Sequence, residues 1–404
     1  MSSFDYIVVG CGGIGSGAVY WLSKVAGKGV LGLEQFSIGH VRGGSQDYSR
    51  IIRHLYHDEM YTKLTQATYD TWADVEKESG LQLVYKCGTL DLAPRDAPAA
   101  QVIEKCADAL DKQRIKYEKL DGLGIRRYFP QWKFGAEMVG LYQRDGGLVD
   151  AASGNAAHIQ LARGNGATVI DNCAVTGIRK LGPNNIQVTT NKGEFRCKRV
   201  IVTAGAWIND VLGSCGVHLP VTVTQEQVTY YATPHMRDFT KDKFPVFIYH
   251  GDSHDLYGLP IYGNTGTKMG IDVGGHEVTG DTRTWTPDPV RENKQEDFLK
   301  RFLPKFLGPI LETRTCLYTM TPDRNFVVDN LARKGLPEVS FCCGAGHAYK
   351  FASLLGKILS QLAIDGRTTY DISKFSMERE AIADPNFPKN FGLGRVVGVH
   401  KAKL

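Results

Sequence analysis

Tyr6-Ile7-Val8-Val9-Gly10-Cys11-Gly12-Gly13-Ile14-Gly15 is the stretch of sequence that decides the fold. Its four leading residues form a continuous apolar run, which is typical of a strand buried on both faces of a parallel sheet. Glycines follow at once, and apolar residues at helical spacing then continue to about Lys24. The pattern predicts a strand, a glycine turn and a helix in direct succession.

A second strand and an acidic residue complete this unit. Val30-Leu31-Gly32-Leu33 reads as the next strand, and Glu34 stands at its tip. Glycines at 10, 12 and 15 allow a tight turn and a close approach of the backbone to a pyrophosphate, whose charge then faces the start of the helix. Glu34 would accept hydrogen bonds from ribose hydroxyls and disfavours a 2′-phosphate, so the motif indicates FAD or NAD rather than NADP. The alternative is a plain βαβ unit whose glycines only ease packing.

Length and composition limit the classes of protein that fit. The chain has 404 residues, which suggests two or three domains or one large α/β domain with insertions. Its 42% hydrophobic and 23% charged residues exclude wholesale disorder and collagen-like or coiled-coil folds. The 48 Lys and Arg against 43 Asp and Glu leave a net charge of +5 that is not gathered into a basic tract. We therefore expect no nucleic-acid partner.

Cysteine usage and the two ends of the chain bear on its location. Nine cysteines are scattered without a CxxC pair, which indicates reduced intracellular thiols and neither a disulfide framework nor a metal site. We expect no membrane span and no secretory signal, because charge, Gly or Pro interrupts every apolar stretch and Asp5 precedes the first one without a basic region. Ala402-Lys403-Leu404 matches the SKL-type address that a peroxisomal import receptor reads, so the predicted location is peroxisomal and otherwise cytoplasmic. A frayed, solvated tail is the alternative explanation.

Later patterns alternate between α/β and β-rich character. Helices are predicted from about Asp58 to Ser79, at Ala99–Gln113 and at Asn155–Arg163, with strands near Val169 and at Val200–Thr203. Alternating runs between about 217 and 322 predict an antiparallel sheet, and Val339–Cys343, a glycine turn and a helix through Leu362 then repeat the opening order. The fold class is α/β, with α+β character overall. We predict a Rossmann-like nucleotide-binding domain assembled from residues 1–80, 145–216 and 323–404, and a β-rich antiparallel substrate domain from residues 81–144 and 217–322.

Five ordered motifs resemble one family. They are VVGCGGIGSG at 8–17, SRIIRHLY at 49–56, YGLP at 257–260, TCLYTMTPD at 315–323 and GAGHAYKF at 344–351. Together they are similar to the FAD-dependent amine oxidases that include monomeric sarcosine oxidase, N-methyltryptophan oxidase and peroxisomal pipecolate/sarcosine oxidase. The resemblance covers nearly the whole chain and implies an FAD-binding domain and an oxidase of secondary amines that releases hydrogen peroxide.

The resemblance implies a covalent flavin anchor at Cys316. In the family, a cysteine followed by such a Tyr-Thr and Thr-Pro-Asp string forms a thioether to the flavin ring, and here the string runs from Cys316 to Asp323. On residue type alone, a single cysteine is more often an inert buried hydrophobe.

Two arginines indicate carboxylate recognition. Arg50 and Arg53 stand three residues apart, which on a helical turn would place both guanidinium groups on one face, and a planar fork suits bidentate binding of a carboxylate. The resemblance implies that Arg53 holds the substrate carboxylate and that Arg50 lies against the flavin. It also implies that Lys350, three residues after His347, completes the clamp. A solvated surface ion pair is the commoner reading of an arginine.

The resemblance also implies a lysine beside which dioxygen reacts. Lys268 follows Pro260 by eight residues, the spacing at which the family places a lysine over the flavin, where a fixed ammonium stabilises the negative charge that dioxygen acquires. Tyr257 would line the substrate pocket. Asp272 and Gln46 stand where sarcosine oxidases carry histidines, and Ala348 replaces a glycine. We expect Asp272 to favour a cationic or hydroxyl-rich group and sarcosine itself not to be the best substrate.

The predicted function is an FAD-dependent oxidase of secondary amines of α-amino acids, with an amino acid and dioxygen as small-molecule partners. Alternatives are a flavin dehydrogenase, an oxidase of another amine such as a fructosyl amino acid or saccharopine, and a non-catalytic FAD-binding redox protein, for which Lys268 would be unnecessary. The candidate catalytic residues are Lys268, Arg50, Tyr257, Asp272 and His347, and the candidate substrate ligands are Arg53, Lys350, Gln46 and Tyr318. The candidate FAD contacts are Gly10, Gly12, Gly15, Glu34, Ser45, Ser49, Arg50, Val175, Gly205, Cys316, Gly344, Gly346, His347 and Lys350.

Overall fold

The opening unit predicted from sequence is present in the computed structural model, which describes residues 2–392. Strand β1 (Ser3–Val9) leads through the glycine turn into helix α1 (Gly13–Ala26), and β2 (Val30–Leu33) then pairs with β1 in parallel. Val8 is fully buried, as a strand covered on both faces requires. The tripeptide Ala402-Lys403-Leu404 lies outside the described residues.

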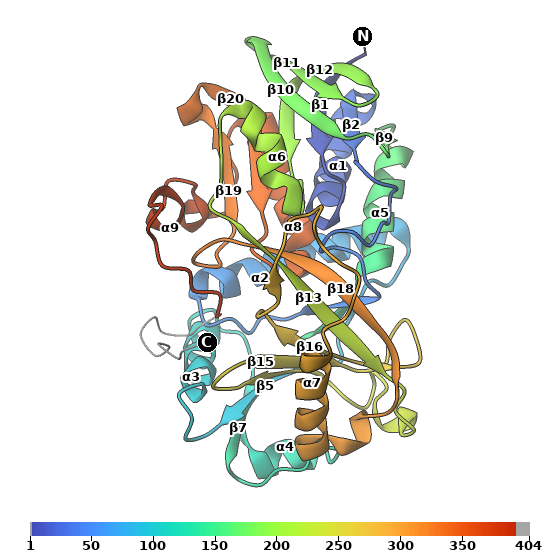
Figure 1. Ribbon diagram of the computed structural model, residues 1–404, viewed down its shortest axis with the longest axis vertical. Helices are drawn as coiled ribbons and strands as arrows, with labels where there is room; N and C mark the ends of the chain where they lie inside the picture. Colours follow the sequence, from blue (N-terminus) through green and yellow to red (C-terminus); the bar gives the residue numbers. More distant parts are fainter. Residues whose placement is uncertain (1, 393–404) are drawn as a thin grey trace.

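The first sheet has eight strands in the order β10-β11-β12-β1-β2-β9, with β20 beside β12 and β19 beside β20 (Figure 1). The pairs that flank β1 are parallel, whereas β10, β11 and β12 form an antiparallel meander. Helix α1 packs against α8, and a Cβ on Gly356 would lie 2.4 Å from the backbone carbon of Gly17, so only glycines permit this approach. The remaining bounds are β9 (Thr168–Ile170), β10 (Val175–Gly182), β11 (Asn185–Thr190), β12 (Gly193–Val202), β19 (Val327–Leu331), β20 (Leu336–Cys343), α5 (Ala151–Gly164), α6 (Ile208–Leu212), α8 (Ala352–Asp365) and α9 (Glu380–Ala383).

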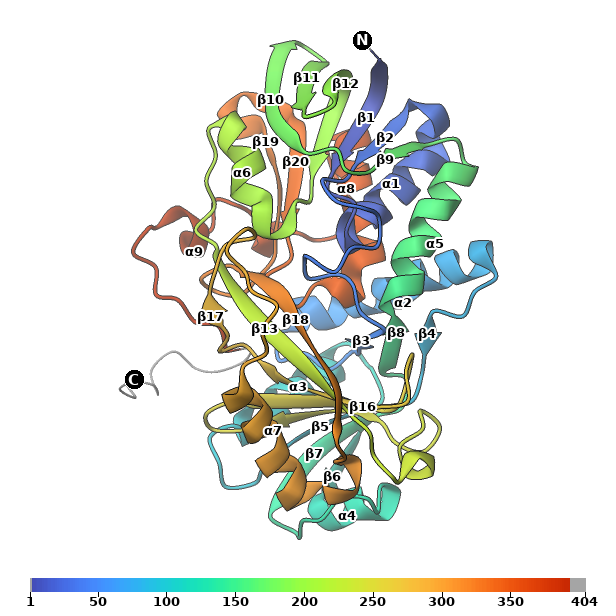
Figure 2. The same cartoon turned by 45° about the vertical axis from the view of Figure 1, so that its right-hand side comes forward.

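The second sheet has nine strands in the order β17-β13-β16-β15-β14-β5-β7-β6, with β18 beside β13. All its pairs are antiparallel, as predicted, except that of β14 with β5. The long strands β13 and β18 of this sheet run diagonally, with their upper ends toward the first sheet (Figure 2). The bounds are β5 (Thr89–Pro94), β6 (Glu118–Asp121), β7 (Met138–Gln143), β13 (Thr222–Tyr231), β14 (Val246–His250), β15 (Asp255–Leu259), β16 (Thr267–Asp272), β17 (His276–Glu277), β18 (Ile310–Met320), α3 (Ala100–Lys112), α4 (Gly122–Tyr128) and α7 (Pro289–Phe302).

A three-stranded sheet of β3 (Ser49–Ile52), β8 (Gly147–Asp150) and β4 (Val84–Tyr85) accompanies helix α2 (Glu59–Ser79). Here one expectation is wrong, because residues 49–52 form a strand rather than a helical turn. Pairing of β3 with β8 supplies the hydrogen bonds of its backbone. Side chains along a strand point alternately to its two faces, so the spacing of the two arginines does not place them on one helical face. Helix α2 ends at Gly80, whose φ of +71° is the left-handed conformation that glycine tolerates.

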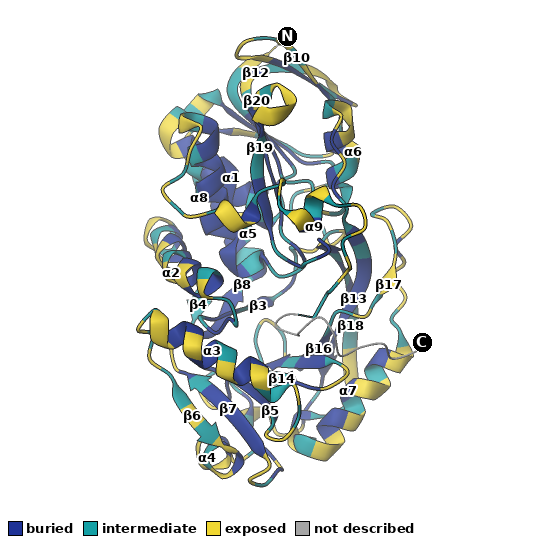
Figure 3. Cartoon of the chain, turned by 90° about the vertical axis from the view of Figure 1, so that its left-hand side faces the viewer, coloured by how far each residue is buried: buried dark blue, intermediate teal, exposed yellow. Residues whose placement is uncertain are grey.

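Helix α3 has exposed residues on one side, and its buried residues pack against β5 and β7 (Figure 3). Strands from 3–33, 168–202 and 327–343 build the first sheet, and strands from 89–143 and 222–320 build the second. The two-domain organisation and its boundaries stay a prediction. Within residues 2–392, no helix combines the length and apolar character needed to cross a membrane.

Candidate active site

A cavity of about 860 Å³ connects the glycine turn of the first sheet with the inner strands of the second. It is lined by every candidate site residue except Gly15 and Ser49. This volume lies in the upper range of ligand pockets. The cavity can therefore hold part of a dinucleotide together with a small substrate. Residues from both predicted domains therefore meet in one place.

The glycine turn explains one end of this cavity. Gly10 has φ +85°, and a Cβ there would lie 2.7 Å from the carbonyl oxygen of Thr203. A Cβ on Gly15 would lie 1.8 Å from the carbonyl oxygen of Gly10, so Gly15 acts through close packing of helix and turn rather than by facing the cavity. The N–H of Gly13, at the start of α1, donates to the Ser45 hydroxyl at 2.9 Å.

The residues at this end fit FAD. Glu34 is buried, accepts from the N–H of Cys11 at 2.8 Å and lies at the cavity wall, where a ribose would meet its carboxylate. Gly205 has φ +54°, and a Cβ there would meet no atom within 4 Å, so the backbone is bare toward open space. Val175 lines the same wall. A bare backbone, a helix start whose N-cap is a glycine and a buried acid form the cradle that a dinucleotide requires.

Lys268 lies in a buried ion-pair cluster. Its Nζ donates to Asp47 at 2.6 Å and to the carbonyl oxygen of Ser49 at 2.7 Å, and its side chain is almost wholly buried. Asp47 also accepts from Arg50 at 2.7 Å and from the Tyr230 hydroxyl at 2.7 Å. Burial lowers the pKa of Lys268, although Asp47 opposes that shift. Burial alone would raise the pKa of Asp47, but the charges of Lys268 and Arg50 hold it well below the usual range. Arg314 also lies 3.6 Å from Asp47, so one carboxylate serves three cations.

A buried carboxylate fixes the position of Arg53. Arg53 forms a buried ion pair with Asp91, and Asp91 also lies 3.0 Å from Nε2 of His250. Nδ1 of His250 faces Asp255 at 3.3 Å. Burial would lower the pKa of His250, but the two carboxylates raise it to about 9, so the imidazole is cationic at neutral pH. Arg53 therefore presents to the cavity a guanidinium whose orientation Asp91 fixes.

Hydrogen bonds fix the orientation of Lys350. Its Nζ donates to the Tyr56 hydroxyl at 3.0 Å and to the carbonyl oxygen of His347 at 2.9 Å. Tyr56 in turn lies 3.2 Å from Nδ1 of His347, whose Nε2 lies 3.0 Å from the carbonyl oxygen of Arg324. A carbonyl can only accept, so Nε2 carries the proton and Tyr56 donates to Nδ1. Burial, then the charge of Arg53, lowers the pKa of Lys350 to about 7.

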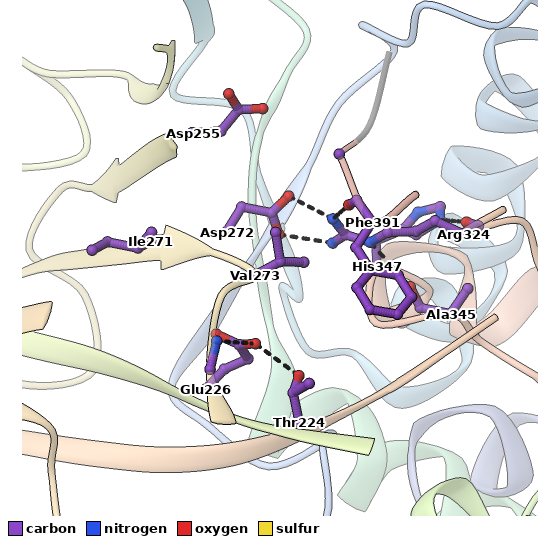
Figure 4. Close-up of polar contacts among 12 residues, drawn as sticks. Thr224, Glu226, Asp255, Ile271, Asp272, Val273, Arg324, Ala345, His347 and Phe391 are labelled. Atoms are coloured by element: carbon purple, nitrogen blue, oxygen red, sulfur yellow. Dashed lines mark hydrogen bonds and ion pairs between the residues drawn. The ribbon is translucent and has the colours of Figure 1, made fainter. Parts of the chain in front are cut away.

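Asp272 is paired with an arginine that sequence reasoning missed. Both carboxylate oxygens of Asp272 accept from Arg324, at 2.8 and 2.9 Å (Figure 4). Arg324 follows Thr321-Pro322-Asp323 and carries no sequence signal of a role at the site. The expectation that Asp272 acts as a single free charge on a substrate is therefore incomplete, because a guanidinium neutralises it.

The remaining candidates lie between these clusters. Cys316 lies in β18 and lines the cavity, and burial raises the pKa of its thiol to about 11. Gly346 has φ +79°, and a Cβ there would lie 2.8 Å from the ring of Tyr318. Tyr257 lies on β15, and Gln46 and Gly344 line the cavity.

Other residues at the site also escaped prediction. Asp47 stands three residues before Arg50, and this acid-arginine spacing is the signal that could have identified it. Asp91 and His250 are the only ionisable acid and imidazole in strands of mainly apolar residues, and that pattern gives no sign of a shared ion pair. Within residues 2–392, no group of three His, Cys, Asp or Glu residues could hold a metal ion.

Comparison with known proteins gives likenesses over nearly the whole chain. The family described as FAD dependent oxidoreductase matches residues 5–362. A monomeric sarcosine oxidase of Arthrobacter sp. (strain TE1826) is 28% identical over 383 residues, which cover 94% of this chain and 97% of that protein. An N-methyl-L-tryptophan oxidase of Escherichia coli O157:H7 is 30% identical over 384 residues, which cover 93% and 99%. The solved structure of NikD, an unusual amino acid oxidase essential for nikkomycin biosynthesis, aligns with a TM-score of 0.82 and 26% identity over 93% of this chain and 98% of that chain.

Proposed function

Since this chain belongs to the FAD-dependent oxidoreductase family, we propose that it oxidises the secondary amine of an α-amino acid and passes the electrons to dioxygen. In this reaction the C–H and N–H bonds of the amine give two electrons and two protons, which reduce dioxygen to hydrogen peroxide. The imine that remains is hydrolysed to an aldehyde or ketone and an amine. The observation that carries the proposal is that a dinucleotide cradle, two carboxylate-binding cations and the buried Lys268 share one cavity.

FAD would be held by the glycine turn, by Glu34 and by the bare backbone at Gly205. When bound, FAD supplies the acceptor for a hydride equivalent from the substrate and returns the electrons to dioxygen. We further propose that Cys316 carries the flavin covalently. Its place on the cavity wall in β18 supports this role. Forming a thioether would break the S–H bond of Cys316, which its raised pKa keeps intact at neutral pH, and a C–H bond of a ring methyl. The two electrons released would pass to the bound FAD and from it to dioxygen.

The substrate carboxylate would bind between Arg53 and Lys350. Arg53 already has Asp91 as its counter-ion, whereas Lys350 forms no ion pair with a carboxylate among residues 2–392. One buried cation without an anionic partner suits one incoming carboxylate. Tyr257, Tyr318 and Gln46 would surround the amine, because all three line the cavity.

Dioxygen would react beside Lys268. Lys268, Arg50 and Arg314 pair with Asp47, and Arg314 also pairs with Glu312, so three cations face two carboxylates and an excess positive charge remains. A fixed positive charge without water around it stabilises the negative charge that dioxygen acquires. Lys268 is therefore the residue that favours an oxidase over a dehydrogenase or a non-catalytic flavoprotein.

A peroxisomal location would suit an enzyme that releases hydrogen peroxide. This finer proposal depends on Ala402-Lys403-Leu404 alone. A fusion that adds a fluorescent protein ahead of residue 1 should enter peroxisomes, and deletion of residues 402–404 should leave it outside them. Equal distributions of the two fusions would contradict the proposal.

Activity with an amino acid panel tests the proposed reaction. The purified holoenzyme is mixed with sarcosine, pipecolate, proline and an N-substituted lysine, and oxygen consumption and peroxide are measured together. At least one acid should give equal amounts of peroxide formed and oxygen consumed. The amide of that same acid is the matched control and should react poorly, because it offers no carboxylate to Lys350 and Arg53. Equal rates for acid and amide would contradict the proposed substrate site.

A further inference from the structure

An ion pair joins Asp272, which lines the cavity, to Arg324 (Figure 4). Asp272 ends strand β16 and lines the cavity, whereas Arg324 comes from the segment that follows β18 and is 1% exposed. The contact is bidentate, with N–O distances of 2.8 and 2.9 Å. This planar pairing is the strongest form of a carboxylate–guanidinium contact.

Other contacts fix Arg324 in place. Its Nη1 also donates to the carbonyl oxygen of Phe391 at 2.6 Å, and its Nε donates to that of Ala345 at 3.4 Å. The backbone around the pair is strained, because Val273, Arg324 and Ala345 have φ values of +58°, +57° and +48°. Side chains with a Cβ rarely adopt such values, and a β-branched valine almost never does. A strained backbone persists only where the surrounding contacts determine it, and such sites cluster at ligand-binding places.

The pair is electrostatically coupled to the substrate clamp. The charge of Asp272 raises the pKa of Lys350, and the charge of Arg324 lowers it. Asp272 also stands directly opposite Asp255 in the pairing of β15 with β16. Asp255 faces His250 at 3.3 Å, so each of these two neighbouring carboxylates has its own cationic partner. An unneutralised carboxylate here would repel the substrate carboxylate from Lys350. An unneutralised guanidinium here would attract a second carboxylate.

We infer that Arg324 and Asp272 form a specificity-determining pair that keeps this wall of the substrate pocket electrically neutral, so that an amino acid with one carboxylate and an uncharged side chain is preferred. The inference rests on the proposed function, because it takes the cavity to be the site of an amino acid. Neither residue takes part in bond breaking. Each acts by cancelling the field of the other at the substrate.

Binding of a carboxylate without an amine tests this inference independently of turnover. The probe is cyclopentanecarboxylate, and its Kd is measured by calorimetry on the holoenzyme from pH 6 to 8. Each variant also shifts the pKa of Lys350, so the Kd values compared are those extrapolated to fully protonated Lys350. Arg324→Gln should weaken binding about tenfold, because the charge of Asp272 is exposed. Asp272→Asn, which keeps the shape of the side chain, should tighten binding severalfold. The double variant Arg324→Gln/Asp272→Asn should return to within about threefold of the natural protein.

Opposite signs for the two single variants are the decisive result, since a purely structural role would weaken binding in both. Equal weakening in both, or a double variant no better than Arg324→Gln, would overturn the inference. If Arg324→Gln does not fold, Asp272→Asn alone decides by the sign of its effect. Lys350→Met is the control for the site: if it leaves the Kd of the natural protein unchanged, the proposed substrate site fails as well, and otherwise only the pair is at stake.

Discussion

Replacing Lys268 with methionine removes a charge from the place where dioxygen is proposed to react, with little change in side-chain length. In the structure its Nζ lies 2.6 Å from Asp47 and is shielded from water. At about 4 Å and an effective dielectric constant of about 20, one unit charge acting on another contributes about 4 kcal/mol. Arg50 remains on the same carboxylate and keeps part of that field. We therefore expect a loss of about 3 kcal/mol, or about two hundredfold in the rate of reoxidation.

Stopped-flow measurement of the two half-reactions separates this effect from general damage. Reduction by substrate without oxygen should slow by less than about tenfold, while reoxidation of the reduced enzyme slows about two hundredfold. Lys268→Arg keeps the charge and should restore most of the reoxidation rate. Asp47 retains Arg50 and Tyr230 in the methionine variant, so the free energy of unfolding should fall by only about 1–3 kcal/mol. Equal slowing of both half-reactions, or no rescue by arginine, would refute the reasoning.

Three further predictions concern the anchor, the clamp and the glycine turn. Cys316→Ala should release the flavin on acid precipitation while the fold remains, and flavin that stays with the precipitate would place the anchor elsewhere. The Kd of cyclopentanecarboxylate should rise as pH increases above about 7, because Lys350 then loses its proton; in Lys350→Met this dependence should flatten, and a persistent slope would assign it to another group. Gly15→Ala should lower flavin content and the free energy of unfolding by at least about 1–3 kcal/mol, because its Cβ would lie 1.8 Å from the carbonyl oxygen of Gly10; unchanged flavin content and Tm would contradict that packing.

Local patterns predicted the fold well where they carry a periodic or conformational signal. The strand, turn and helix around Gly10, the end of α2 at Gly80 and the antiparallel character of residues 222–320 are confirmed. The resemblance to FAD-dependent amine oxidases is confirmed by the family match and by the curated relatives. The helical turn expected at Arg50 and Arg53 was wrong, because a short apolar run fits either a strand or a helix. Pairing with β8 makes residues 49–52 a strand.

The ion-pair partners at the site could not be predicted from the sequence. Asp91 and Arg53 are separated by 38 residues, and Asp272 and Arg324 by 52. No local pattern marks such pairs, since they depend on the order of strands in the second sheet and on the path of the chain after β18. The assigned roles of Lys268, Arg53, Lys350 and Cys316 stay predictions. Their shared cavity is consistent with those roles.

Anaerobic reduction of the bound flavin tests the central claim most directly. The holoenzyme is titrated without oxygen with an N-alkyl or cyclic α-amino acid, followed by air, and the flavin spectrum and peroxide are recorded. We expect complete bleaching of the flavin by the acid, little bleaching by its amide, and one hydrogen peroxide for each flavin when air is admitted. A flavin that no secondary amino acid reduces, or that reoxidises in air without peroxide, would contradict the account.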